Sequence, residues 1–165
     1  DGAGAAVVQA EEGELYPSVA GSDGTMGHVL ACESRVQNDW QQKEADRKTY
    51  IDMDGTAVFK FAVRKMPEMA KYLMAQLHCT EADIDWFITH QANERIIEAI
   101  AKRLKSDIAK FPMNIAECGN TSSASIPILL DEMNRSGQLK DGQKIIMAGF
   151  GAGLSWGAVY MEWHA

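Results

Sequence analysis

The stretch WFITHQANERI at residues 86–96 decides the fold of this chain. Its beginning, Trp86 to Thr89, is a short and mainly apolar run, which is typical of a buried strand. The apolar residues that follow, from Ile96 to Leu104, recur at the spacing of a helix. A buried strand followed by a helix is the repeating unit of a layered α/β domain. His90 therefore stands at the carboxyl end of a strand, where the ligands of such domains bind.

The same alternation of strands and helices continues on both sides of this stretch. Helical spacing predicts a helix from Thr56 to His78, in which Pro67 predicts a kink or a break just before that residue. A third helix is expected from Asn120 to Arg135. The polar residues from Glu33 to Lys48 are expected to form an exposed excursion. Apolar runs predict further strands at Ala3 to Ala10, Leu15 to Ala20, Lys144 to Ala148 and Leu154 to Trp163.

Composition and charge exclude several classes of function. With 165 residues and 46% hydrophobic content, the chain is long enough for one globular domain. Its net charge of −7 gives no general attraction to nucleic acid or to anionic lipid. It lacks an apolar run of roughly 18 residues, the length of a membrane span, so we expect a cytoplasmic protein. Three dispersed cysteines without CxxC spacing predict reduced thiols, with neither a disulfide framework nor a metal site.

Two polar side chains are candidates for chemistry, and each also has a purely structural explanation. His90, beside a predicted helix N-terminus, would be held neutral and could donate a hydrogen bond, but it could equally bond only to backbone. Asn120 precedes a predicted helix and is expected at a second strand-to-helix junction, although it could be a plain helix N-cap. Together the two side chains supply uncharged donors, which suit an oxygen that becomes negative during a reaction.

The glycine-rich run GFGAG at residues 149–153 is a candidate backbone site. It is not a dinucleotide-binding loop, because it lacks the G-x-G-x-x-G spacing and a strand follows it. A tight connection between strands, with backbone N–H groups that approach a ligand, explains it better. Cys118 lies close to Asn120 but has no helix N-terminus to lower its pKa, which favours a structural thiol over a nucleophile.

One face of the helix that follows His90 is basic. Arg95 and Lys102 share this face, with Arg103 beside it. A basic face on an acidic chain could bind an acidic partner, but Glu98 is also spaced to form an intrahelical ion pair with Lys102. From the residues alone, the ion pair is the favoured explanation.

Four sequence blocks carry a resemblance to a known family. They are DGAGA at residues 1–5, MDGTAVFKFAV at 53–63, HQANERI at 90–96, and GNTSSASIP at 119–127 with GFGAGLSWGA at 149–158. In this order they resemble the ketoacyl-acyl-carrier-protein synthase III enzymes, condensing enzymes of the thiolase superfamily. The resemblance implies that residues 1–165 form the C-terminal βα half of a thiolase-like layered α/β fold, a mixed sheet flanked by helices. The core of that C-terminal region is expected at about residues 79–165.

The resemblance also assigns expected roles to single residues. It makes His90 and Asn120 two members of a Cys-His-Asn triad. It implies a backbone oxyanion amide near Ala152, between Gly151 and Gly153. Gly55, Phe59 and Asn93 are expected along a pantetheine channel, with Phe150 lining the site. The basic residues expected to meet an acidic carrier protein are Lys60, Arg95, Lys102 and Arg103.

The implied reaction is the decarboxylative condensation of an acyl-CoA with malonyl-acyl-carrier protein, which starts fatty-acid chains. Such an acyltransferase needs no metal and no cofactor beyond the coenzyme A thioester that is its substrate. The nucleophilic cysteine belongs to an N-terminal half that this chain lacks, so we expect the working molecule to include that half and to be a homodimer. The sequence leaves two alternatives open: a non-catalytic scaffold that binds carrier protein, and a related ketosynthase of secondary metabolism.

Overall fold

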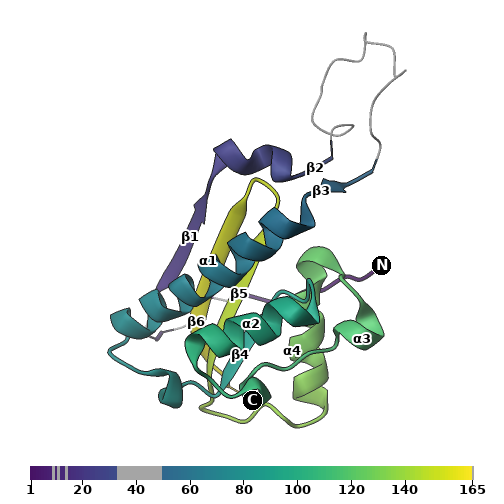
Figure 1. Ribbon diagram of the computed structural model, residues 1–165. Helices are drawn as coiled ribbons and strands as arrows, with labels where there is room; N and C mark the ends of the chain where they lie inside the picture. Colours follow the sequence, from purple (N-terminus) through teal and green to yellow (C-terminus); the bar gives the residue numbers. More distant parts are fainter. Residues whose placement is uncertain (9, 11, 14, 33–49, 165) are drawn as a thin grey trace, which may run out of the picture.

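The computed structural model describes residues 1–8, 10, 12–13, 15–32 and 50–164, and the expected excursion from Glu33 to Lys48 lies outside these residues. A mixed four-stranded sheet forms the centre, as Figure 1 shows. β4 runs parallel to β5, and the other neighbours are antiparallel. Leu30–Ala31 (β2) and Asp52–Met53 (β3) form a separate two-stranded sheet. The strands of the main sheet are, in spatial order, β1 (Ser18–Ser22), β6 (Ser155–Glu162), β5 (Lys144–Gly151) and β4 (Trp86–Thr89).

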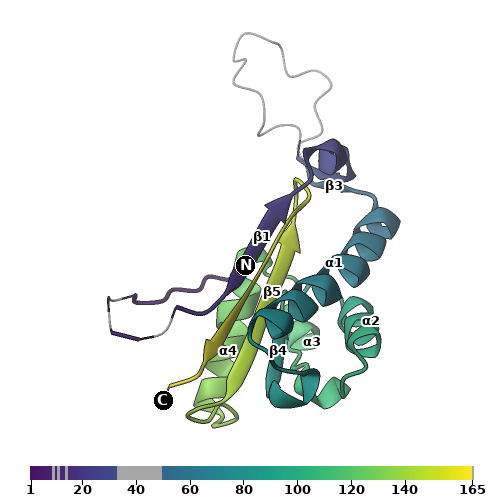
Figure 2. The ribbon, with the colours of Figure 1, turned by 90° about the vertical axis from the view of Figure 1, so that its left-hand side faces the viewer.

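Helices cover both faces of the main sheet (Figure 2). Helices α1 (Gly55–Gln76) and α2 (Glu94–Leu104) pack on one face, and α4 (Ser125–Arg135) packs on the other. Alternation along β4 explains this arrangement, because successive side chains of a strand point to opposite faces. Phe87 thus belongs to the apolar cluster with α1 and α2, whereas Ile88 packs with Leu129 and Met133 of α4.

Among the described residues, four short 3-10 helices and one short α-helix are the remaining helical elements. The helix predicted to begin at Asn120 begins instead at Ser125, and a 3-10 turn precedes it. The strands predicted from residues 86, 144 and 154 are confirmed as β4, β5 and β6. The short elements are η1 (Gly24–Val29), η3 (Glu81–Asp83), η4 (Ile108–Lys110), α3 (Ile115–Cys118) and η5 (Ser122–Ala124).

Helix α1 continues through Pro67 as one helix, so the break that was one of the two expected outcomes does not occur. Proline has no N–H group and leaves the carbonyl of the residue four positions earlier without its usual helical donor. Here that carbonyl belongs to Val63, and it accepts a hydrogen bond of 3.0 Å from Nη1 of Arg103 on α2. A side chain from the neighbouring helix therefore replaces the donor that Pro67 lacks.

The two strands predicted near the N-terminus need correction. The described residues of the segment from Ala3 to Ala10 form no strand, and the strand predicted from Leu15 to Ala20 lies at Ser18–Ser22. A Cβ atom added at Gly4 would lie 2.3 Å from Pro127 of α4, so this part of the chain lies against a helix. Strand formation requires an unpaired sheet edge, and apolar sequence alone does not place a segment beside one.

The surroundings of Asn120 differ from the prediction as well. No strand precedes Asn120; instead, Cys118 is the last residue of the short helix α3. Asn120 lies in the connection between α3 and η5, before α4. The expected second strand-to-helix junction is therefore wrong, because Ile115–Cys118 forms a helical turn in which the N–H of Cys118 donates to the carbonyl of Asn114.

Candidate functional site

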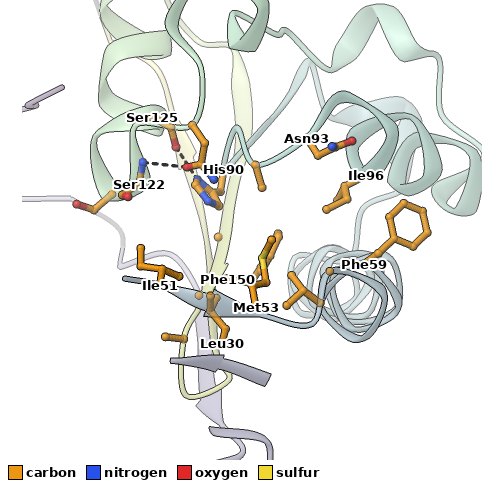
Figure 3. A pocket seen from close by; sticks show the side chains of 18 of the residues that line it. Leu30, Ile51, Met53, Phe59, His90, Asn93, Ile96, Ser122, Ser125 and Phe150 are labelled. Atoms are coloured by element: carbon orange, nitrogen blue, oxygen red, sulfur yellow. Dashed lines mark hydrogen bonds between the residues drawn. The ribbon is translucent and has the colours of Figure 1, made fainter. Parts of the chain in front are cut away.

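One large cavity, of about 1010 Å³, contains most of the predicted site residues. Segments far apart in the sequence form its walls, as Figure 3 shows. Leu30, Ile51 and Met53 lie on one side, and His90, Ser122 and Ser125 lie on the opposite side. Phe59 of α1 and Asn93, which precedes α2, extend the cavity outward from His90. The cavity is therefore a mainly apolar space with polar groups gathered at one end.

His90 lies directly after β4 and points into this cavity. Its backbone N–H donates to the carbonyl of Ala148 on the parallel strand β5, at 2.9 Å, which anchors the turn. Its Nδ1 atom lies 2.7 Å from Oγ of Ser125, and its ring meets that of Phe150 edge-on at 5.6 Å between centroids. Burial lowers the pKa of the imidazole below its ordinary value and so favours the neutral form of His90.

The neutral state expected for His90 is thus supported, but its cause differs from the one expected. Helix α2 begins at Glu94, and the side chain of Asn93 caps it by accepting a hydrogen bond of 2.9 Å from the N–H of Arg95. Burial of the imidazole is the cause of the lowered pKa. Among the described residues, Nε2 of His90 has no hydrogen-bond partner, which leaves it available to a ligand.

Asn120 lines the same cavity from an exposed position. Its Oδ1 atom accepts a hydrogen bond of 3.0 Å from the backbone N–H of Ser122. Because a backbone N–H can only donate, this bond fixes which end of the amide is oxygen, and it leaves the Nδ2 donors unused within the described part of the chain. The cap-like bond and a donor role are therefore compatible, since they use opposite ends of one amide.

The GFGAG run forms the end of β5 and the turn into β6. Gly149, Phe150, Gly151 and Ala152 line the cavity, whereas Gly153 is not among its lining residues. Gly153 has φ +130°, a conformation that residues other than glycine rarely adopt. The structure therefore brings Ala152 and Gly151 to the cavity and leaves Gly153 to turn the chain.

The predicted channel residues also meet at the cavity. Gly55, Phe59, Asn93 and Phe150 all line it. Gly55 begins α1, and a Cβ atom added there would have no neighbour within 4 Å among the described residues. The Phe59 ring is 37% exposed, which places it toward the mouth rather than in the core.

The structure separates the four predicted basic residues. Arg95 lines the cavity at the first turn of α2, whereas Lys60, Lys102 and Arg103 do not line it. Nη1 of Arg103 donates a hydrogen bond to the carbonyl of Val63. The alternative intrahelical pair between Glu98 and Lys102 is absent from the ion pairs of the described residues.

The cysteines of this chain do not supply an evident nucleophile. Cys32 lies in the cavity wall after β2, whereas Cys79 and Cys118 lie outside the cavity. Burial raises the pKa of the Cys79 thiol, and burial together with Glu132 raises the pKa of Cys118. An activated cysteine has a lowered pKa, so these two shifts run in the opposite direction. The described residues also contain no group of three His, Cys, Asp or Glu side chains placed to hold a metal ion.

Two residues that contact the His90 turn were not predicted. No role was expected for Ser125, yet its Oγ atom contacts both His90 and the N–H of Gln91. The amide of the fully buried Gln91 donates to the carbonyl of Thr89 at 2.9 Å and accepts from the N–H of Asn114 at 3.3 Å. A polar residue two positions after a buried strand was the available signal for Gln91, but its partner Asn114 is distant in the sequence.

Sequence comparisons place this chain among known proteins. Residues 74–163 match the family described as "3-Oxoacyl-[acyl-carrier-protein (ACP)] synthase III C terminal". The Beta-ketoacyl-[acyl-carrier-protein] synthase III of Clostridium novyi (strain NT) is 45% identical over 166 residues, covering 99% of this chain and 51% of that protein. The protein of the same name from Clostridioides difficile (strain 630) is 44% identical over 167 residues, with the same coverage. The chain thus spans about half the length of the curated relatives it matches.

Solved structures show the same relationship. The 3-oxoacyl-(acyl carrier protein) synthase III of Pseudomonas aeruginosa PAO1 has a TM-score of 0.80 and 36% identity, covering 97% of this chain and 47% of that chain. The synthase III of Thermus thermophilus has a TM-score of 0.80 and 36% identity, covering 89% and 45%. These likenesses confirm the thiolase-like layered α/β fold. The match to the family includes more than half of the residues of this chain. The chain therefore belongs to the 3-oxoacyl-[acyl-carrier-protein] synthase III family and corresponds to the C-terminal part of its members.

Proposed function

We propose that residues 1–165 are the C-terminal half of a β-ketoacyl-acyl-carrier-protein synthase III, with its C-terminal core at about residues 79–165. The complete enzyme would condense an acyl-CoA with malonyl-acyl-carrier protein, with loss of carbon dioxide, to start fatty-acid synthesis. One observation carries the proposal: two uncharged side chains, His90 and Asn120, line the same mainly apolar cavity, and each has a nitrogen without a hydrogen-bond partner among the described residues. Membership of the family suggests which reaction is proposed, and the two donors in the cavity suit the enolate that forms in that reaction.

In this reaction a cysteine thiolate from the N-terminal half attacks the acyl-CoA carbonyl, and the coenzyme A thiolate leaves. The malonyl thioester then loses carbon dioxide, and the electrons of the broken C–C bond form an enolate. Its carbon attacks the acyl-enzyme carbonyl, and the cysteine thiolate leaves as the new C–C bond is complete. We assign stabilisation of the enolate oxygen to Nε2–H of His90 and to Nδ2–H of Asn120.

Electrostatics supports these roles for the two donors. Neutral donors add no ion to a mainly apolar cavity, and they bind an oxygen more strongly as its negative charge grows. Donors of this kind are worth about 2.7–4 kcal/mol each in other oxyanion sites. Burial that holds His90 neutral preserves this function near pH 7. The backbone N–H of Ala152 is the proposed donor for the second oxyanion, which forms on the acyl-enzyme carbonyl.

The substrate path proposed for the pantetheine arm runs past Phe150, Asn93, Phe59 and Gly55, all of which line the cavity. We propose that an acidic carrier protein binds at its mouth, where Arg95 is exposed. Lys60 on α1 and Lys102 and Arg103 on α2 are also exposed, and we propose that they contact the carrier protein beyond the cavity mouth; Nη1 of Arg103 already donates to the carbonyl of Val63. The homodimer and the cytoplasmic location stay predictions, and no described helix is long and apolar enough to cross a membrane.

Covalent labelling of the complete protein tests this proposal. The complete protein, with the proposed N-terminal half present, is incubated with a radiolabelled acyl-CoA and then digested for peptide mapping. The proposal predicts one acylated cysteine outside residues 1–165 and release of the label as a β-ketoacyl product when malonyl-acyl-carrier protein is added. Acylation of Cys32, or tight carrier-protein binding with no acylation, would contradict it; the second outcome would favour the scaffold alternative.

A further inference from the structure

The hydroxyl group of Ser125 contacts the histidine turn at two points. Its Oγ atom lies 2.7 Å from Nδ1 of His90 and 3.3 Å from the backbone nitrogen of Gln91. Ser125 is 2% exposed at the first turn of α4, so little of its surface is open to water. The two contacts join α4 to the end of β4 across 35 and 34 residues of sequence.

The number of protons determines the direction of the hydrogen bond between Ser125 and His90. The N–H of Gln91 can only donate, so it occupies one lone pair of the serine oxygen. The hydroxyl has one proton of its own, and among the described residues Nδ1 of His90 is the only acceptor within its reach. If Nδ1 carried a proton instead, the buried hydroxyl proton would have no acceptor, which is costly. The O–H of Ser125 therefore donates to Nδ1.

We propose that Ser125 is a positioning residue that keeps His90 in the neutral tautomer with its proton on Nε2. The inference rests on the proposed function, because it explains how His90 would present a hydrogen-bond donor to the cavity. An imidazole with its proton on Nδ1 would instead turn an acceptor toward an enolate oxygen and repel it. Ser125 thus acts through His90, and its own hydroxyl does not touch the substrate.

The same hydrogen bond also opposes full protonation of the ring. An imidazolium carries protons on both nitrogens, so it cannot accept from the O–H of Ser125. A hydrogen bond that requires the neutral form lowers the pKa of a histidine, in the same direction as its burial. Removal of the hydroxyl should therefore raise the pKa of His90 and release the tautomer at the same time.

A spectroscopic experiment tests the tautomer without reference to catalysis. The complete protein, with ¹⁵N-labelled histidine, is compared with Ser125→Ala and with Ser125→Thr, which retains a hydroxyl. The His90→Asn variant identifies the His90 signals by their loss. We expect Nε2 protonated and Nδ1 unprotonated in the unaltered protein and in Ser125→Thr, and averaged signals from both tautomers in Ser125→Ala. A protonated Nδ1 in the unaltered protein, or an unchanged tautomer in Ser125→Ala, would overturn the assignment.

Kinetics separates a failure of this inference from a failure of the proposed function. Malonyl decarboxylation by Ser125→Ala should fall about 10- to 100-fold in kcat, as for other residues that orient a functional histidine, with KM little changed. Ser125→Thr should recover most of the loss. Ser136→Ala, a control on the same helix whose hydroxyl bonds to the carbonyl of Met133, should leave the rate unchanged. A tautomer that depends on Ser125 without any effect on rate would keep the positioning role and refute the enolate role of His90.

Discussion

The two segments that carry His90 and Asn120 are built in different ways. His90 follows a buried parallel strand, and its orientation depends on Ser125, which lies 35 residues away in the sequence. Asn120 lies in an exposed connection, and the N–H group that fixes its amide is only two residues away, at Ser122. One donor of the proposed site thus depends on long-range packing, and the other depends on local backbone conformation. Substitutions in the two segments should therefore affect stability and reaction rate in different proportions.

Asn120→Ala should have the largest effect on the reaction rate relative to its effect on stability. The change removes one of two enolate donors, so malonyl decarboxylation should fall about 10²- to 10³-fold. Stability should fall by less than about 1 kcal/mol, because only one exposed local hydrogen bond is lost. Decarboxylation assays and urea unfolding of the complete protein measure the two effects, with the exposed Asn134→Ala as control. A large loss of stability would show that the Asn120 segment is not locally determined.

In the segment that carries His90, replacement of Gln91 by Leu should mainly lower stability. Its fully buried amide connects the carbonyl of Thr89 to the N–H of Asn114, and leucine would leave both groups without partners. We expect the free energy of unfolding of the complete protein to fall by about 2–3 kcal/mol. The matched change at the exposed Gln138 should alter it by less than about 0.5 kcal/mol. Equal effects at the two glutamines in urea unfolding would refute the structural role of Gln91.

Of the His90 and Asn120 segments, only the His90 segment should make the free energy of unfolding depend on pH between 5.5 and 7.5. The pKa of His90 is lowered by burial in the folded protein, whereas unfolded histidine keeps its ordinary value of about 6.5. The unfolded state therefore binds more protons between these two pKa values, and the free energy of unfolding falls as the pH drops through this window. One proton limits the slope to less than about 1.4 kcal/mol per pH unit. Urea unfolding between pH 7.5 and 5.5 should be less steeply pH-dependent in His90→Asn; identical slopes would contradict the lowered pKa.

The smallest effect is expected at Ser122, whose φ of +55° is unfavourable for any residue except glycine. Ser122→Gly should raise the free energy of unfolding by about 0.5 kcal/mol, because relief of this conformation exceeds the added entropy of the unfolded chain. Ser123 does not have a positive φ, so Ser123→Gly should lower stability by about 0.5–1 kcal/mol. Thermal unfolding of the two variants compares them directly, and a loss of stability in both would contradict the local account.

The elements that could be predicted from the sequence are those whose signal is local. The strand at Trp86–Thr89 and the helix at Glu94–Leu104 follow from apolar patterns within each segment. The strand predicted at Ala3 to Ala10 failed because pairing depends on a sheet edge that the segment's own residues do not specify. The uninterrupted helix through Pro67 was equally hidden, since Arg103 supplies the missing donor from 40 residues away.

The candidate site shows the same division. Their expected places at strand ends made His90 and Asn120 candidates, and the resemblance to family motifs added Phe59 and Phe150; the structure brings all four to one cavity. Ser125 was missed because serine at a helix start is ordinary, and only the fold places its hydroxyl against His90. The structure therefore adds the contact between His90, a motif residue, and Ser125, its distant partner.

The most direct test of the central claim compares the two half-reactions in His90→Ala. In the complete protein, acyl transfer from acyl-CoA to the cysteine and decarboxylation of malonyl-acyl-carrier protein are measured separately. We expect decarboxylation to fall about 10²- to 10³-fold while acyl transfer stays within a few-fold of its original rate. Equal loss of both half-reactions, or retention of decarboxylation, would contradict the assignment of His90 as a donor to the enolate oxygen.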